Sequence, residues 1–213
     1  MGKLKCTDVS NITAYLSYDN TEIKSNIVIK ISIFNMIIPY INMLYCDPSF
    51  LIFAVALIIS VGCLVFIIYY KMKVLPTQKQ INLYYAVSML FMSVNLCYVS
   101  CVFFSQTFIG FLLPLVLLVL TVPFCVFFTI KTECKRINSG FHKDKKSENA
   151  IIIPITVAAA GLGVFASRLV GNQLDDQIVL GVCCGILGII FSFFSRFLVK
   201  WYCYRLLENF QGK

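Results

Sequence analysis

Long uninterrupted runs of apolar residues dominate the chain and determine its predicted secondary structure. Crossing the roughly 30 Å hydrocarbon core of a bilayer takes about 20 residues of α-helix. Five runs reach this length, at 49–70, 82–104, 108–130, 150–170 and 178–199. Their apolar residues are consecutive rather than alternating, which excludes membrane β-strands. The pattern therefore predicts an all-α fold, a polytopic transmembrane helical bundle.

A sixth apolar segment, at 26–46, is interrupted by polar residues and a proline: Lys30, Asn35, Pro39 and Asn42. The distribution of basic residues indicates whether it crosses the membrane, because Lys and Arg are retained in cytoplasmic loops. The gaps 105–107 and 171–177 contain neither residue, whereas the gaps before and after them are basic. This alternation holds at every gap if 26–46 is also a span.

Six crossings place both termini in the cytoplasm, in a protein of the plasma membrane. Five crossings, the alternative, would leave the amino-terminal lysines outside. We expect three helical hairpins within 26–199, preceded by a polar cytoplasmic segment at 1–25 and followed by an interfacial cytoplasmic tail at 200–213. The basic segment 131–149 is expected to be a flexible loop held near anionic lipid.

The composition supports a membrane protein and argues against a soluble domain or a nucleic-acid-binding protein. Of the 213 residues, 59% are hydrophobic and only 13% charged, too little charge for the surface of a soluble domain. The net charge of +8 resides largely in the segments between apolar runs, so it does not predict nucleic-acid binding. The ten cysteines are scattered, and those inside apolar runs are expected to be reduced and buried.

Catalytic chemistry is not indicated anywhere in the chain. An intramembrane enzyme needs paired nucleophilic or ionisable groups at depth. The single histidine, His142, lies in the basic loop, and the apolar runs from Ser49 onward contain no Asp or Glu. Cys97 and Cys101 share a helical face, but two thiols alone make a poor metal site. We therefore expect no catalytic residue, metal or cofactor.

Small residues follow one helical face in each of the last two apolar runs. In the last run they are Gly181, Gly185, Gly188, Ser192 and Ser195, which include a GxxxG motif. In the preceding run they are Thr156, Ala160, Gly163 and Ser167. Such faces allow close approach of helix backbones in lipid. They predict packing of the two helices as a hairpin, or packing of one face against a second subunit.

A possible ligand contact or ion pair is indicated near the outer boundary. Arg168 lies close to the end of its apolar run and faces the acidic turn of Asp175 and Asp176. The arginine either pairs across this turn or contacts an anionic solute. Asn95 and the prolines of the run 108–130 are the other residues that could belong to a solute pathway.

Two functional hypotheses follow from these observations. The first is a non-enzymatic multi-pass protein that acts as an accessory, assembly or immunity subunit for another membrane protein. The absence of buried carboxylates for ion coupling in the five long runs favours it. The alternative is a small self-associating transporter or channel for a small or anionic solute, which would require a water-filled cavity beside Asn95. Expected partners are the lipid bilayer and a second copy or another membrane protein.

Overall fold

The computed structural model describes residues 9–18, 23–40, 50–72, 77–103, 108–139 and 176–211. Within these ranges the chain is helical and contains no strand, so the prediction of an all-α chain is confirmed there. The elements are α1 (Val9–Tyr18), α2 (Ser25–Ile37), α3 (Phe50–Met72), α4 (Gln78–Phe103), α5 (Phe108–Asn138), α7 (Asp176–Ser192), the 3₁₀ turn η2 (Phe193–Ser195) and α8 (Arg196–Gln211). The predicted span at 150–170 lies outside the described residues.

Three of the described stretches are long and apolar enough to cross a membrane. They are Phe53–Met72, Gln78–Phe103 and Leu180–Phe210. The third runs through α7, η2 and α8, so the helix continues beyond residue 199, where we expected the span to end. These lengths and compositions indicate a membrane protein, in agreement with the sequence.

The segment expected to form the first span is shorter than predicted in the part that the structure describes. Helix α2 has 13 residues, which correspond to about 20 Å of helix. The α-helix ends at Ile37, and residues 38–40, which include Pro39, continue it as a 3₁₀ turn. Its buried residues Val28, Ser32 and Asn35 follow helical spacing and form one inward face. Residues 41–46 of the predicted span are not among those described.

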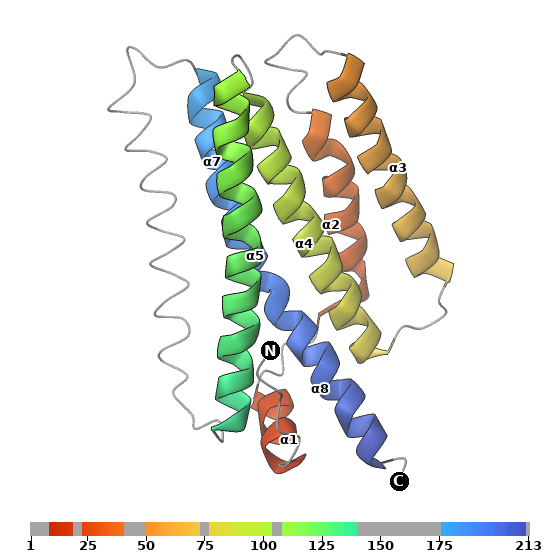
Figure 1. Ribbon diagram of the computed structural model, residues 1–213. Helices are drawn as coiled ribbons and strands as arrows, with labels where there is room; N and C mark the ends of the chain where they lie inside the picture. Colours follow the sequence, from red (N-terminus) through yellow and green to blue (C-terminus); the bar gives the residue numbers. More distant parts are fainter. Residues whose placement is uncertain are drawn as a thin grey trace.

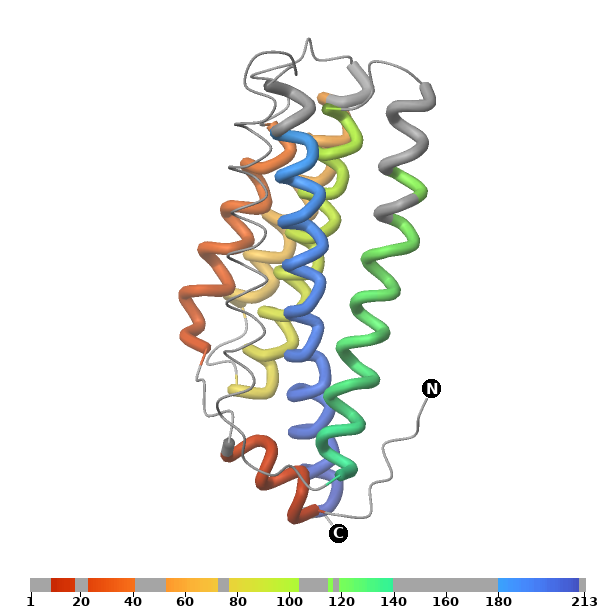
Figure 2. Tube along the Cα trace, turned by 90° about the vertical axis from the view of Figure 1, so that its left-hand side faces the viewer, coloured from red at the N-terminus to blue at the C-terminus, as the bar shows by residue number. Residues whose placement is uncertain are grey.

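Helices α2, α3, α4 and α5 alternate in direction and lie side by side (Figure 1). Helix α4 occupies the centre of the bundle, and 72% of its most apolar 18-residue stretch is buried. In α3, at the outer edge, only 17% of the corresponding stretch is buried. Helices α7 and α8 pack along α4, while α1 lies across the end of the bundle reached by α5 and α8 (Figure 2). The described helices are therefore organised around α4.

The amino-terminal segment and the basic loop differ from expectation at this end of the bundle. Residues 9–18 form α1, and α5 continues as a helix to Asn138 instead of becoming a loop after residue 130. Ile12 and Tyr15 of α1 pack with Ile137, Val199 and Cys203, which are all buried. These apolar contacts stabilise α1 and the end of α5. The polar composition of both segments had not predicted that they would pack together.

Candidate functional site

Four polar side chains from α2 and α4 meet inside the bundle and form what we call the polar layer: Ser32, Asn35, Ser88 and Asn95. Each is at most 3% exposed. Asn35 Nδ2 donates to the backbone oxygen of Ser88 at 2.9 Å, and Asn95 Nδ2 lies 3.3 Å from both the backbone and the side-chain oxygen of Asn35. Since lipid offers no hydrogen-bond partner, these contacts hold α2 against α4.

The two serines of the polar layer have a defined hydrogen-bond direction. Ser32 Oγ donates to the Val28 carbonyl oxygen at 2.9 Å, and its distance to Ser88 Oγ is 3.3 Å. A hydroxyl has one hydrogen, so Ser88 must be the donor between the two serines. The Ser88 oxygen then keeps lone pairs with which it can accept a further hydrogen bond.

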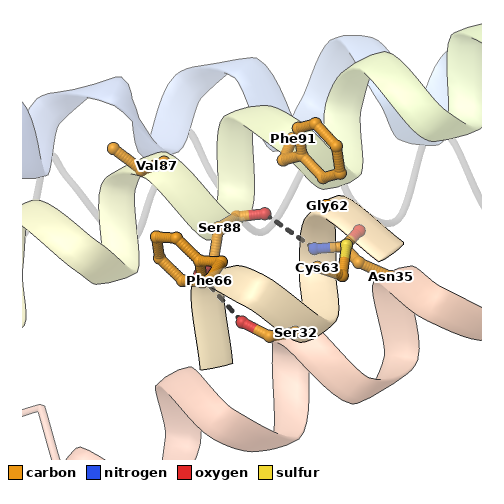
Figure 3. A pocket seen from close by; sticks show the side chains of 8 residues that line it. All are labelled: Ser32, Asn35, Gly62, Cys63, Phe66, Val87, Ser88 and Phe91. Carbon is orange, nitrogen blue, oxygen red and sulfur yellow. Dashed lines mark hydrogen bonds between the residues drawn. The ribbon is translucent and has the colours of Figure 1, made fainter. Parts of the chain in front are cut away.

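A pocket of about 220 Å³ adjoins the polar layer between α2, α3 and α4 (Figure 3). Its lining comprises Ser32, Asn35, Gly62, Cys63, Phe66, Val87, Ser88 and Phe91. The polar residues and Cys63 are buried, whereas Val87 is 39% exposed and Phe91 36% exposed. The pocket therefore has a buried floor with polar groups and an apolar rim at the outer surface of the bundle.

Gly62 in α3 lines this pocket and is exposed. A Cβ added at Gly62 would meet no atom within 4 Å. Glycine in a helix interior costs about 0.5–1 kcal/mol relative to alanine, and no close backbone contact requires glycine here. Gly62 was not singled out by the sequence, because one glycine in an apolar run is common in membrane helices.

The small face of α7 packs against α4. Gly181, Gly185, Gly188 and Ser192 of α7 are buried, as is Ser195 of the following turn η2. A Cβ at Gly185 would lie 3.0 Å from Ser100 Oγ, and one at Gly188 would lie 2.7 Å from Cys97 Sγ and 3.0 Å from the Ser93 carbonyl oxygen. Ser93 Oγ also donates to the Gly188 carbonyl oxygen at 2.6 Å. Close approach and an interhelical hydrogen bond thus occur at the same place.

The other predicted site residues fall partly outside the described chain. Thr156, Ala160, Gly163, Ser167, Arg168 and Asp175 are not described, and Asp176 is described only as the first residue of α7. Asn95 is described, but its amide is bonded to Asn35 and it does not line the pocket. Ser32 and the pairing of Asn35 with Asn95 were missed, since helical periodicity does not identify which helices meet.

Among the described residues, no group of three or more metal-ligating side chains comes together. Cys97 and Cys101 are buried in an apolar cluster, where Leu115, Val122 and Ile189 pack against them. This environment differs from that of a metal centre, which supplies several donor atoms to one ion.

Charged groups gather at the end of the bundle near α1 and α8. Glu133 accepts a hydrogen bond of 3.0 Å from the Tyr15 hydroxyl and pairs with Arg136 at 3.2 Å. Burial and the charge of Glu133 raise the pKa of the neighbouring Cys134 thiol. Lys200 is buried with its ammonium group 5.0 Å from the centre of the Phe197 ring, a cation–π geometry. An ion pair between Lys79 and Glu208 joins α4 to α8.

Together, the fold and these contacts define a helical bundle with helices able to cross a membrane, a buried polar layer and a small lateral pocket. Comparison of the chain with protein-family models, curated proteins and solved structures gave no match.

Proposed function

We propose that the protein is a non-enzymatic multi-pass membrane protein that acts as an accessory subunit of another membrane protein, which it contacts through α3. The observation that supports this proposal is the narrow attachment of α3. Among the α3 residues whose burial is described, 53–72, the buried ones are Ala56, Cys63 and Tyr70, which follow a spacing of seven and form one seam. A broad apolar face remains outside, including Phe53, Leu57, Ile58, Val61, Val65 and Ile68. Partner helices in membranes dock on such surfaces through van der Waals packing.

We propose six crossings in the plasma membrane with both termini in the cytoplasm, five being the alternative. The alternating directions of α2 to α5 are compatible with successive crossings (Figure 1). Helix α1 and the end of α8 lie at the same end of the bundle. Lys79, Lys135, Arg136 and Arg205 belong to helix segments at that end, and basic residues favour the cytoplasmic side.

Photo-crosslinking in the native host membrane tests the partner proposal. A benzophenone amino acid is placed at Ile58 or Val65, which are 69% and 59% exposed, and at Val119 of α5, which is 61% exposed, as a matched control. We expect the α3 positions to give one discrete protein adduct and Val119 to give lipid adducts. Lipid adducts alone at both α3 positions would contradict docking through α3.

A transporter or channel is the second candidate, and the pocket beside the polar layer is the observation that favours it. Against it stands Asn95, whose amide pairs with Asn35 and which does not line the pocket, because a pathway needs polar groups that can contact the solute. Flux of a small anion through proteoliposomes of the purified chain, lost on replacement of Asn35 by alanine in a variant that still folds, would replace the accessory-subunit proposal.

A further inference from the structure

We propose that the pocket between α2, α3 and α4 is a binding site for a small uncharged molecule with an apolar body about the size of one ring and a single hydroxyl group. This inference goes beyond the accessory function and does not depend on a protein partner. It rests on three properties of the pocket: its volume, its lining and the hydrogen-bond capacity of its floor (Figure 3).

The volume limits the ligand to a small molecule. An apolar cavity of about 150 Å³ holds benzene, and drug-sized ligands occupy about 300–1,000 Å³. The present pocket, at about 220 Å³, lies between these values. It therefore fits a substituted ring or a branched chain of similar size.

The lining excludes a charged ligand. Gly62, Phe66, Val87 and Phe91 supply apolar surface, and Cys63 is the only lining residue whose side chain can ionise. An ion placed there would lose its hydration without gaining an opposite charge. An uncharged molecule would instead pack against the two phenylalanines at no cost in lost hydration, and it would gain van der Waals contacts with them.

The floor offers hydrogen bonds to one polar group. Ser88 Oγ, which donates to Ser32, retains acceptor capacity. The Asn35 amide uses one N–H toward the Ser88 carbonyl oxygen, and its oxygen accepts from Asn95. One N–H and one lone pair of Asn35 therefore remain. A ligand hydroxyl can donate to one of these groups and accept from the other.

The opening faces the side of the bundle. The rim residues Val87 and Phe91 belong to α4 at a spacing of four, so they lie on one face of the helix. Their partial exposure places the mouth between α3 and α4, near the middle of both helices. A molecule dissolved in the hydrocarbon core of the membrane would enter from this side without crossing water.

The test uses ¹⁹F NMR of the purified full-length chain in nanodiscs, with 4-(trifluoromethyl)phenol as the probe. Its methyl isostere, 4-(trifluoromethyl)toluene, reports apolar binding without the hydroxyl. We expect saturable binding of the phenol above the partitioning seen in empty nanodiscs. Ser88→Ala should weaken the phenol about two- to tenfold, the range for one neutral hydrogen bond, and leave the isostere unchanged.

Two substitutions that fill the pocket give the decisive comparison. Gly62→Leu extends into open space, and Val87→Trp closes the mouth from an exposed position that tolerates a large side chain. Each should reduce affinity for the phenol more than tenfold. Val61→Leu, which changes the neighbouring exposed residue, should bind like the parent. Size-exclusion profiles identify any variant that fails to fold, in which case the other variant decides.

The proposal is overturned by any of three results. The first is absence of saturable phenol binding to the parent chain. The second is undiminished binding in the folded pocket-filling variants. The third is equal affinity for the phenol and the methyl isostere, which would mean that the polar floor contributes nothing to recognition.

Discussion

At the scale of single residues, glycines in two helices have opposite environments. Gly62 faces open space, whereas Gly188 lies against the Ser93 carbonyl oxygen and the Cys97 backbone and sulfur. The same substitution should therefore have opposite effects at the two positions, because helix propensity favours alanine at both while steric contact opposes it at only one.

Gly188→Ala should destabilise the protein by about 1–3 kcal/mol, the range for overpacking. The added Cβ would lie 3.0 Å from a backbone oxygen, which cannot rotate away as a side chain can. Gly62→Ala should instead stabilise it by about 0.5–1 kcal/mol. Thermal unfolding in detergent measures both. Equal shifts in the same direction would show that α7 and α4 are not in close contact.

Another residue-scale prediction concerns Tyr15, whose hydroxyl donates to buried Glu133. Tyr15→Phe removes this hydrogen bond and should lower stability by about 1–3 kcal/mol, since the acceptor is a carboxylate. Ser17→Ala, at an exposed position of the same helix, is the control and should change little. Faster proteolysis after α1 in Tyr15→Phe alone would locate the effect at this end of the bundle; identical cleavage rates would contradict it.

At the scale of helices, α2 depends on the polar layer for its attachment to α4. Asn35 and Asn95 come from different helices and are 1% exposed each. In a double-mutant cycle, Asn35→Ala and Asn95→Ala should couple by about 0.6 kcal/mol, the average for hydrogen bonds between membrane helices, and by no more than about 1.7 kcal/mol, the largest value found.

The cycle also has an internal control on the same helix. Ser32 makes no hydrogen bond to Asn95 and is bonded to Val28 and Ser88. Ser32→Ala combined with Asn95→Ala should therefore couple more weakly than the two asparagine substitutions, because these residues share the polar layer but no direct hydrogen bond. Additivity of the two asparagine substitutions would argue against direct pairing of α2 and α4 through these amides.

At the scale of the whole molecule, the arrangement of helices in the membrane makes a prediction about the two termini. Reporter fusions after Ser25, Thr107, Lys146 and Gln211 should read inside, outside, inside and inside. The reason is retention of basic segments in the cytoplasm. An outside reading after Ser25, with the other three unchanged, would leave five crossings and remove α2 from the set of spans.

The sequence by itself determined the membrane class, the helical content and the set of small residues that share one face of α7. In lipid, an apolar run of about 20 residues or more must form a helix, because only then do its backbone N–H and C=O groups all make hydrogen bonds. The helices Phe53–Met72 and Gln78–Phe103 could therefore be placed from composition alone. The repeat from Gly181 to Ser195 likewise identified a face, because helical periodicity orders residues around an axis.

Only the tertiary structure decided which helices meet. It placed the small face of α7 on α4, paired Asn35 with Asn95 and left space beside Gly62. It also folded α1 onto Glu133 at the end of α5, in a region where the sequence indicated polar, flexible chain. The physical reason is that apolar helices in lipid have no hydrophobic preference for one another, so partner choice depends on contact shape and on a few interhelical hydrogen bonds.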